Sequence, residues 1–514
     1  MIITFVHNFK KVTAIYQDFV AVSSFNSSKK VQEILFDFAQ RFPDAHLLWV
    51  HESLANQVNY DWLLATSKNQ VMYFFNPSET EFLSEKVGYV EPSPYIKINK
   101  EINYPSWQAS VFVGCISAKD FVFFGGSFLQ NKFSFGYFLT IMAKIGHHNG
   151  FRTYSNANLL QTPVKVKPYV GITQELFNWT AQCYGFSKCF QLFLLLVLVE
   201  KQFPILHLLA VVFVKRIATI QSPVSTAVVS NHLELETVTL DVLIPTIGRK
   251  PYLYDVLSDL KLQTKIPNRV IIVEQNPLTT SQSELDYLKD ESWPFEIVHH
   301  FIHQTGACNA RNIALKAVQS DWVFFADDDI KLAPNFIEAC FKTILNSNEK
   351  AFTLACFKSN EKPVFHQVMH WDTFGSGCSI VKKEALDGLR FDMRFENGFG
   401  EDADFGMQLR NKGIDILYLP SPQILHLKAP VGGFRVKPIL PWQEEVIQPK
   451  PSPTVMLFKK MYHTKEQLLG YQLNLFLKYY KNQSIKNPFK YFVTMQKQWE
   501  VSEKWAEKLK SQLK

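Results

Sequence analysis

Three consecutive carboxylates, Asp327, Asp328 and Asp329, directly follow the apolar run Trp322–Ala326 and are the residues best suited to chemistry. A run of this composition predicts a strand inside a sheet, and ligands bind at the carboxyl edge of open α/β sheets. Three negative charges there repel one another unless a cation joins them. The pattern favours a hard divalent metal that binds a nucleotide diphosphate. An acidic turn that caps a helix near Pro334 remains an alternative.

The elements that must position these carboxylates alternate between strand-like and helix-like segments from about residue 236 to 436. Strands are expected at 239–245, 269–274 and 295–299, and helices at 253–262 and 308–318. This alternation predicts βαβ units and a parallel sheet. The polar residues that follow successive strands are therefore expected at one edge.

The first two strands each end in residues that could contact a nucleotide. Pro245-Thr246 begins a turn in which backbone amides can approach a ligand, and Arg249 can meet a phosphate or a base. Glu274 ends the second strand and is followed by two amides, which suit the hydrogen-bonding edge of a nucleobase. A polar turn that leads to Pro277 explains the second pattern equally well.

A further candidate is the start of the helix before the acidic strand. Gly306, Asn309, Arg311 and Asn312 lie in its first turns. A helix N-terminus with a nearby arginine attracts a diphosphate. A surface arginine is the alternative, although it would not usually come with two asparagines.

Two segments after the acidic run could also line such a site. Trp371 and Gly375-Ser376-Gly377 offer an aromatic wall and flexible backbone near a sugar. Glu401 and Asp402 then open a helix, and a base that accepts a hydroxyl proton needs such a fixed position. Carboxylates in a first helical turn can also simply complement the helix dipole.

Towards the end of this region, His426 ends a strand-like segment and precedes a Gly-Gly-x-Arg loop that contains Arg435. A single histidine is usually structural. In this position, however, the histidine could complete the ligand shell of a metal, and the loop could close over phosphates.

The order of these landmarks resembles the family 2 glycosyltransferases, which have the GT-A nucleotide-sugar-binding fold, over about residues 238–436. The resemblance implies metal-dependent, inverting transfer of a sugar from a nucleotide diphosphate, with UDP- or dTDP-sugars favoured. The expected acceptor is a hydroxyl of a glycan or a lipid-linked molecule, as in the synthesis of bacterial surface polysaccharide.

The resemblance also implies a role for each matching residue. Asp327, Asp329 and His426 would hold Mg²⁺ or Mn²⁺, and Asp402 would be the catalytic base, with Glu401 as the substitute candidate. The residues expected to bind the nucleotide sugar are Pro245, Thr246, Arg249, Glu274, Gly306, Asn309, Arg311, Asn312, Asp327, Asp328 and Arg435, and those on the acceptor side are Trp371, Gly375, Ser376 and Gly377.

Two other functions share parts of this pattern. A non-catalytic scaffold that binds nucleotide sugars would not need Glu401, Asp402 and the acidic run. A sugar-phosphate nucleotidyltransferase would need a glycine-rich basic loop after the first strand, and residues 245–250 contain one glycine. The sequence therefore favours the transferase.

The chain is expected to form four regions: an N-terminal α/β domain (1–165), an apolar helical linker (166–235), the catalytic domain (236–436) and a basic helical extension (437–514). Residues 113–119 align without gaps on 376–382, and 47–52 fall roughly on 323–328. The N-terminal domain is therefore either a degenerate GT-A-like repeat, with His51-Glu52-Ser53 in place of the acidic run, or an unrelated domain. Acceptor binding and dimerisation are the two roles that such a domain suggests.

The linker contains two apolar runs of about ten residues, 189–199 and 205–214, whereas a membrane-spanning helix needs about 20. The segment 200–204, which includes two charges and a proline, also argues against a single span. Two interpretations remain: helices buried in the core, or a hairpin in one membrane leaflet flanked by Lys188 and by Lys215-Arg216.

Composition limits the compartment and the partners. The seven cysteines form no CxxC pair, which favours a reducing cytosol, and the N-terminus predicts a strand rather than a signal peptide. Residues 436–514 contain 14 lysines, six glutamates and no arginine. This charge indicates a solvated helical surface or a phosphate-rich partner, such as the inner face of a membrane, and no nucleic-acid-binding motif accompanies it.

Overall fold

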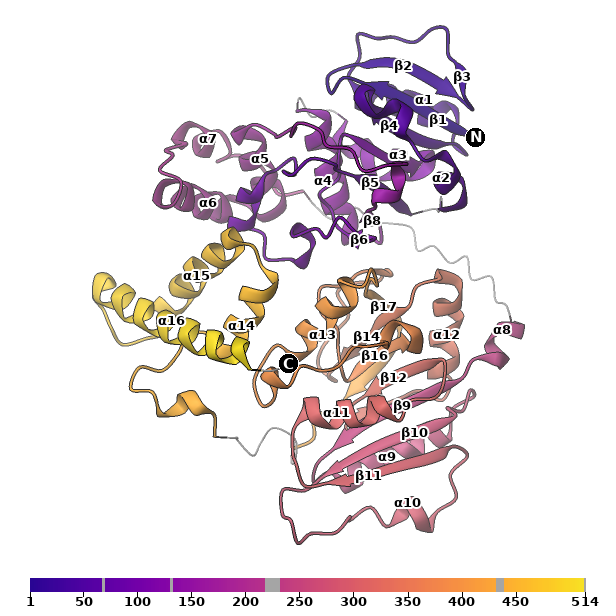
Figure 1. The fold of residues 1–514 in the computed structure, drawn as a ribbon, viewed down its shortest axis with the longest axis vertical. Coiled ribbons are helices and arrows are strands. Elements are labelled where there is room, and N and C mark those ends of the chain that lie inside the picture. Colours follow the sequence, from indigo (N-terminus) through magenta and orange to yellow (C-terminus); the bar gives the residue numbers. More distant parts are fainter. Residues whose placement is uncertain (67–69, 130–132, 218–231, 431–438, 513–514) are drawn as a thin grey trace. The chain divides into compact units, whose positions relative to one another are not determined.

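The computed structural model describes residues 1–66, 70–129, 133–217, 232–430 and 439–512 (Figure 1). The chain divides into two compact units. Unit 1 consists of Met1–Pro223 and Tyr462–Gln483, and unit 2 consists of Val224–Met461 and Ser484–Lys514.

Unit 2 contains a nine-stranded sheet whose first half is parallel, as the alternation predicts. Four neighbouring parallel strands are β11 (Glu296–Ile302), β10 (Arg269–Gln275), β9 (Leu240–Thr246) and β12 (Trp322–Ala326). Strands β9, β10 and β12 are buried along almost their whole length, because helices and loops cover both faces. Asp327 therefore leaves the sheet at the carboxyl edge.

The second half of this sheet is mixed, so the predicted all-parallel sheet is wrong for these strands. Strand β16 (Cys378–Lys382) runs antiparallel between β12 and β14 (Ala351–Phe357). Strand β17 (Leu417–His426) is parallel to β14 and also pairs with β13 (Ile330–Lys331) and β15 (Met369–His370). The antiparallel β16 pairs Cys378 with Ala326, which places the preceding glycine loop beside the acidic run.

Some of the helices of unit 2 bury apolar faces against this sheet. Helix α9 shows the spacing of three and four residues that places apolar side chains on one face of a helix: Leu253, Val256, Leu257 and Leu260 are all buried. The helices are α8 (His232–Thr237), α9 (Lys250–Lys261), α10 (Tyr287–Asp290), α11 (Ala307–Lys316), α12 (Phe336–Ser347), α13 (Glu401–Arg410), α14 (Pro453–Tyr462) and α16 (Pro488–Ser511).

Unit 1 contains an eight-stranded sheet that begins with the predicted N-terminal strand. Its spatial order is β3-β2-β1-β4-β7-β5-β8-β6. The strands are β1 (Ile2–His7), β2 (Val12–Gln17), β3 (Val20–Ala21), β4 (His46–His51), β5 (Val71–Phe75), β6 (Tyr104–Pro105), β7 (Val113–Ser117) and β8 (Arg152–Ser155).

Six strands of each sheet have the same arrangement. Strands β1, β4, β5, β6, β7 and β8 match β9, β12, β14, β15, β16 and β17 in chain order, in spatial order and in the direction of every pairing. Where unit 2 adds the parallel strands β10 and β11, unit 1 has the antiparallel hairpin β2–β3. Two copies of one fold would produce this agreement.

The strand register differs from the gapless alignment of 113–119 with 376–382. Val50 pairs with Val113 in unit 1, and Ala326 pairs with Cys378 in unit 2. When Val50 is placed on Ala326, Val113 therefore takes the position of Cys378, two residues from the predicted match. A shift of two residues keeps each side chain on the same face of the sheet, so the apolar pattern alone does not detect it.

The apolar runs of the linker form two short helices of unit 1. They are α6 (Phe186–Leu198) and α7 (Ile205–Ala210), and they pack beside α5 (Thr173–Tyr184) (Figure 1). No helix in the described part of the chain is long and apolar enough to cross a membrane. The other α-helices of this unit are α1 (Val31–Arg41), α2 (Tyr60–Thr66), α3 (Ala118–Gly125), α4 (Phe135–His147) and α15 (Lys465–Tyr480).

Candidate active site

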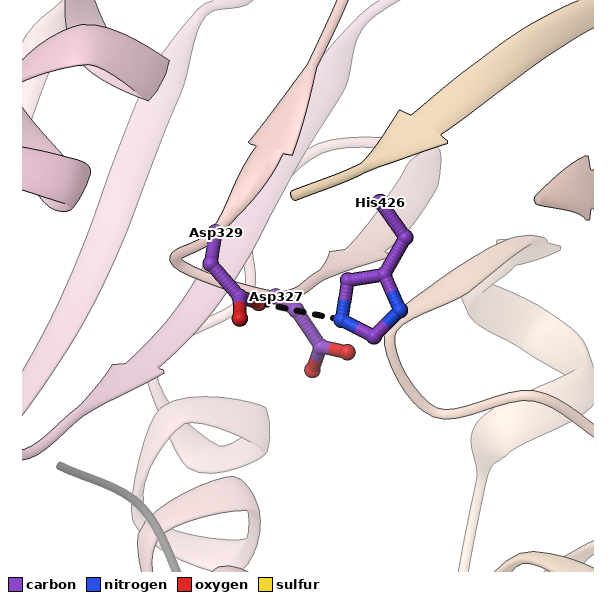
Figure 2. Close-up of side chains that lie close together, drawn as sticks. All are labelled: Asp327, Asp329 and His426. Carbon is purple, nitrogen blue, oxygen red and sulfur yellow. Dashed lines mark ion pairs between the residues drawn. The ribbon is translucent and has the colours of Figure 1, made fainter. Parts of the chain in front are cut away.

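Asp327, Asp329 and His426 converge at the carboxyl edge of β12, with one ligand atom from each within 4.8 Å of the others (Figure 2). The pairing of Ile330 with His426 between β13 and β17 brings the histidine to the acidic run. His426 Nε2 lies 3.3 Å from Asp329 Oδ1. Within the described ranges, no other group of three His, Cys, Asp or Glu side chains meets the same distance criterion.

Backbone amides fix Asp329 in this cluster. Its Oδ2 accepts a hydrogen bond of 2.8 Å from the amide of Ala429, and its carbonyl accepts one of 2.8 Å from the amide of Leu427. Burial raises the pKa of Asp329, but the hydrogen bonds from His426 and Ala429 outweigh burial and leave this pKa below its usual value. The hydrogen bond to Asp329 raises the pKa of His426 above 6.5.

Asp328 has other partners than the metal cluster. Its Oδ2 accepts a hydrogen bond of 2.7 Å from Thr246 Oγ1, and its Oδ1 lies 2.6 Å from a guanidinium nitrogen of Arg249. The same guanidinium lies 3.3 Å from Asp329. Burial raises the pKa of Asp328 to about 6. Two predicted nucleotide-binding residues therefore contact the acidic run itself, and Asp328 ties β9 to β12.

Gly377 makes room for the first carboxylate of the run. The amide of Asp327 donates a hydrogen bond of 3.2 Å to the carbonyl of Gly377. A Cβ atom on Gly377 would lie 2.1 Å from Asp327 Oδ2, which is far closer than van der Waals contact. Gly377 therefore provides the space that Asp327 needs in the candidate metal cluster, although the sequence suggested the acceptor side.

We expect Gly377→Ala to lower Mn²⁺ affinity at least about tenfold, because the new methyl group would displace Asp327 and ligand positioning typically matters by ten- to hundredfold. Isothermal titration with MnCl₂ measures this change. Gly126→Ala is the matched control, since its Cβ would meet only ordinary contacts at 3.6 Å in unit 1. Equal Mn²⁺ affinity in wild type and Gly377→Ala would contradict this role.

The three ligand groups fit the expected cation. Carboxylate oxygens suit Mg²⁺ and Mn²⁺, and an imidazole ligand is better suited to Mn²⁺ than to Mg²⁺. Asp329 has a lowered pKa and is therefore ionised at neutral pH. Arg311 lies 3.5 Å from Asp327 and adds a positive charge beside the cluster.

Asp402 lies in the first turn of α13 and is the most conspicuous carboxylate outside this cluster. Its Oδ1 is buried and has no hydrogen-bond partner in the described part of the chain. Gly400, with φ of 113°, begins the helix in the left-handed region that favours glycine. Asp404, in the same helix, has a partner within the helix: its carboxylate accepts a hydrogen bond of 2.6 Å from Gln408. Burial, followed by the charge of Asp402, raises the pKa of the neighbouring Glu401.

A cavity of about 380 Å³ adjoins Asp402. One wall is aromatic: Trp371 stacks on Tyr418 at 4.6 Å between ring centroids, and Phe365 meets Trp371 edge-on at 5.8 Å. Trp371 and Gly375, both predicted for the acceptor side, line this cavity, whereas Ser376 is buried outside its lining. The remaining lining residues are Thr353, Leu354, Cys356, Phe357, Val364, Thr373, Phe374 and Cys378.

Glu274, at the end of β10, is held by a hydrogen-bond network that the sequence did not reveal. Ser283 Oγ donates to it at 2.5 Å, the Glu284 amide donates at 3.1 Å, and His299 Nε2 lies at 2.9 Å. Burial raises the pKa of Glu274, but the hydrogen bonds outweigh it, so the carboxylate stays ionised. The network fixes Glu274 at the sheet edge.

Glu396 occupies the start of α11, where the sequence suggested a diphosphate. Its carboxylate accepts hydrogen bonds from the amides of Cys308 at 3.1 Å and Asn309 at 2.7 Å. Gly306 has a φ of 147° and leaves the space for this carboxylate, since a Cβ there would lie 2.3 Å from it. Only its position close before Glu401 could have pointed to Glu396.

The other predicted residues near α11 hold the surrounding loops. Asn312 exchanges two hydrogen bonds of 2.8 Å with the backbone of Phe391, and the guanidinium of Arg311 lies 5.6 Å from the ring centre of Phe391. Pro245 lies near the end of β9. Arg435 lies outside the described residues.

The matching edge of unit 1 is filled by aromatic side chains. The ring of Phe9 lies 4.0 Å from that of His51, which ends β4, and 4.2 Å from that of Tyr169, stacked with both. Ser53 Oγ lies 2.8 Å from His51 Nδ1, so this histidine is already engaged. Tyr137 and Phe138, near the start of α4, are buried in the core of this unit.

Comparison with known proteins agrees with this geometry. The family model described as "Glycosyl transferase family 2" matches residues 241–409. This part of the chain is a family 2 glycosyltransferase domain. This domain includes Asp327, Asp329 and Asp402. The match to the family model confirms the enzyme class that the sequence predicted.

Solved structures show weaker similarity, and no curated protein matches. Residues 1–349 of S. aureus TarS in complex with UDP-GlcNAc are 16% identical, with 53% of this chain and 83% of that chain covered and a TM-score of 0.37. Another structure of TarS 1–349 is 19% identical, with 37% of this chain covered and a TM-score of 0.31. The match spans 60% of the length of that TarS fragment.

Proposed function

We propose that unit 2 catalyses metal-dependent, inverting transfer of a sugar from a nucleotide diphosphate to an acceptor hydroxyl. One observation carries this proposal: Asp402 has a buried, unpartnered Oδ1 and borders the aromatic cavity. It also lies close enough to Asp327 for their charges to interact. A base between a donor site and an acceptor site needs this position.

In the proposed reaction, Asp402 Oδ1 accepts the proton of an acceptor hydroxyl held in the cavity. The hydroxyl oxygen forms a bond to the anomeric carbon while the bond from that carbon to the diphosphate oxygen breaks, which inverts the centre. Asp327, Asp329 and His426 would hold Mg²⁺ or Mn²⁺, and when bound this cation neutralises negative charge on the diphosphate. Arg311 adds positive charge on the same side.

For the donor, the proposal favours UDP- or dTDP-sugars, with the fixed carboxylate of Glu274 at the nucleobase. Its support is the network that keeps Glu274 ionised and immobile. A panel of nucleotide sugars tests the donor: we expect metal-dependent release of nucleoside diphosphate from at least one of them. Binding of nucleotide sugars without any release or transfer would instead indicate a non-catalytic scaffold.

For the acceptor, the proposal names a glycan or a lipid-linked sugar. The stacked pair Trp371 and Tyr418 offers a flat apolar wall beside Asp402, and such walls pack against the apolar faces of sugar rings. The acceptor hydroxyl would then point towards the carboxylate.

We further propose that unit 1 is a degenerate, non-catalytic copy of the same fold. The shared order and direction of six strands support common ancestry. The stacked Phe9, His51 and Tyr169 fill the place that corresponds to the metal cluster. The chain would then have one active site.

Metal affinity should rise with pH, because an imidazolium cannot bind a metal. The pKa of His426 is raised by Asp329, so protons compete with the metal up to a pH above 6.5. We expect Mn²⁺ affinity to rise by up to about tenfold per pH unit below this pKa, since one proton is released on binding. Titration calorimetry at several pH values measures the slope.

His426→Gln is the control for this slope. The variant should bind Mn²⁺ more weakly and show a flatter pH dependence over the same range. The assignment of His426 would be wrong if wild type and variant gave the same slope.

A further inference from the structure

Helices α6 and α7 bury only one of their faces. Cys189, Leu192 and Leu196 of α6 and Leu208 of α7 belong to the core of unit 1. This explains half of the apolar content of residues 186–216: these positions stabilise the unit as ordinary core residues. The opposite positions need a different explanation, because they are also apolar.

The opposite face exposes large apolar side chains, which we call the α6–α7 face. Phe213 is 93% exposed and Leu206 is 76% exposed. The ring of Phe193 in α6 lies 6.4 Å from that of Phe190 in the same helix and 5.3 Å from that of Phe203, which lies between α6 and α7. The exposed members of the face are Phe186, Phe190, Leu198, Val199, Phe203, Leu206, Leu209, Val212 and Phe213.

Such a surface is unusual for a protein surrounded only by water. Single exposed apolar residues are common, but large continuous apolar patches mark sites that bind a protein, a ligand or a membrane. The α6–α7 face is formed by two neighbouring helices and the segments that flank them (Figure 1).

The charged side chains of residues 186–216 are four basic residues and one carboxylate. Lys201, Lys215 and Arg216 are exposed beside the α6–α7 face. The only carboxylate in residues 186–216, Glu200, accepts a hydrogen bond of 2.6 Å from Tyr89. An apolar face with a basic rim complements a membrane surface that carries anionic lipids. Two copies of this rim would repel each other across a symmetric dimer.

We propose that the α6–α7 face docks the protein on an anionic membrane, with its phenylalanine and leucine side chains in the interfacial region of one leaflet. The helices have 13 and six residues, so they lie in the interface rather than cross it. The basic residues contact lipid phosphates. This proposal does not depend on the chemistry proposed for unit 2.

Co-sedimentation of the full chain with vesicles tests the proposal. We expect binding to vesicles of equal parts phosphatidylcholine and phosphatidylglycerol, and much weaker binding to phosphatidylcholine alone. Changing Phe203, Leu206 and Phe213 together to serine should reduce binding at least about tenfold, since burial of each side chain contributes to affinity. Neutralising Lys215 and Arg216 as glutamines should cost about fivefold per charge on anionic vesicles.

Leu64→Ser is the matched control, because Leu64 is a similarly exposed leucine of unit 1 on α2. It should bind like wild type. Circular dichroism checks folding, and the single variant Phe213→Ser replaces the triple variant if the latter does not fold.

Three results would overturn the proposal: no binding of wild type to anionic vesicles, equal binding by the folded serine variant, or an equal loss in Leu64→Ser. Light scattering provides a fourth. If wild type were a dimer and the serine variant a monomer, a second copy of the chain would cover this face, and the proposal would be wrong.

Discussion

Asp402→Asn is expected to lower sugar transfer by about a hundred- to ten-thousandfold, the usual contribution of a general base. The substitution keeps the shape of the side chain but removes its ability to accept a proton. Asp402 is not among the three grouped side chains that we propose to bind the metal, so metal-dependent binding of the nucleotide should change little. Initial rates with a reactive nucleotide sugar, together with calorimetric titration of the nucleotide, measure both quantities.

Glu401→Gln is the matched control, because it makes the same chemical change one residue earlier in the chain. Its rate should fall less than that of Asp402→Asn, since only Asp402 lines the cavity. If Asp402→Asn turned over normally while Glu401→Gln did not, the base would be Glu401 and the assignment would have to be exchanged.

Asp329→Asn is expected to lower Mn²⁺ affinity at least about a hundredfold, because even the loss of an outer-shell partner typically costs ten- to hundredfold. Asp329 also positions His426, so its replacement would disturb two of the three ligands. The rate of sugar transfer should fall together with the Mn²⁺ affinity. Calorimetric titration with MnCl₂ and initial rates at fixed metal concentration give the two numbers.

Asp328→Asn tests whether the loss of a metal ligand, and not a general loss of negative charge, lowers Mn²⁺ affinity in Asp329→Asn. Asp328 is the middle residue of the same run but bonds to Thr246 and Arg249 instead of joining the metal cluster. Its Mn²⁺ affinity should therefore fall by no more than about tenfold, the lower end of the range for an outer-shell partner. Equal losses in both variants would mean that net charge, and not the geometry of Asp329, controls binding.

The pH dependence of stability should also differ between these two carboxylates. The folded-state pKa of Asp328 is raised to about 6, so its contribution favours the folded state at low pH and is lost as the pH rises towards 6. The pKa of Asp329 is lowered, so its contribution is present above its usual pKa and is lost on acidification.

The sequence predicted the parts of the site that follow local rules. The strand before Asp327, the glycine at the start of α11 and the acidic start of α13 all depend on short-range patterns, and each lies where it was expected. The antiparallel entry of β16 was not predicted, because strand pairing is decided by residues far apart in the chain.

Contacts between distant segments explain what the sequence did not reveal. Glu396 caps a helix almost ninety positions earlier, and His299 reaches Glu274 from a neighbouring strand. Neither residue belongs to a recognisable motif. The pocket beside Asp402 likewise depends on the stacking of Trp371, which the sequence indicated, on Tyr418, which it did not.

The proposed repeat in unit 1 shows how far a weak alignment reaches. The alignment matched β4 with β12 and β7 with β16, as the strand orders also do, but it placed β7 two residues from the register that β4 defines. The strand order is the stronger indication, since it involves six strands and the direction of every pairing.

The most direct test of the central claim is anomalous diffraction at the manganese edge from crystals grown with Mn²⁺ and UDP. We predict one manganese peak, between Asp327, Asp329 and His426, and none at His51 in unit 1. Bound UDP without manganese at these three side chains, or a manganese peak in unit 1, would contradict the account.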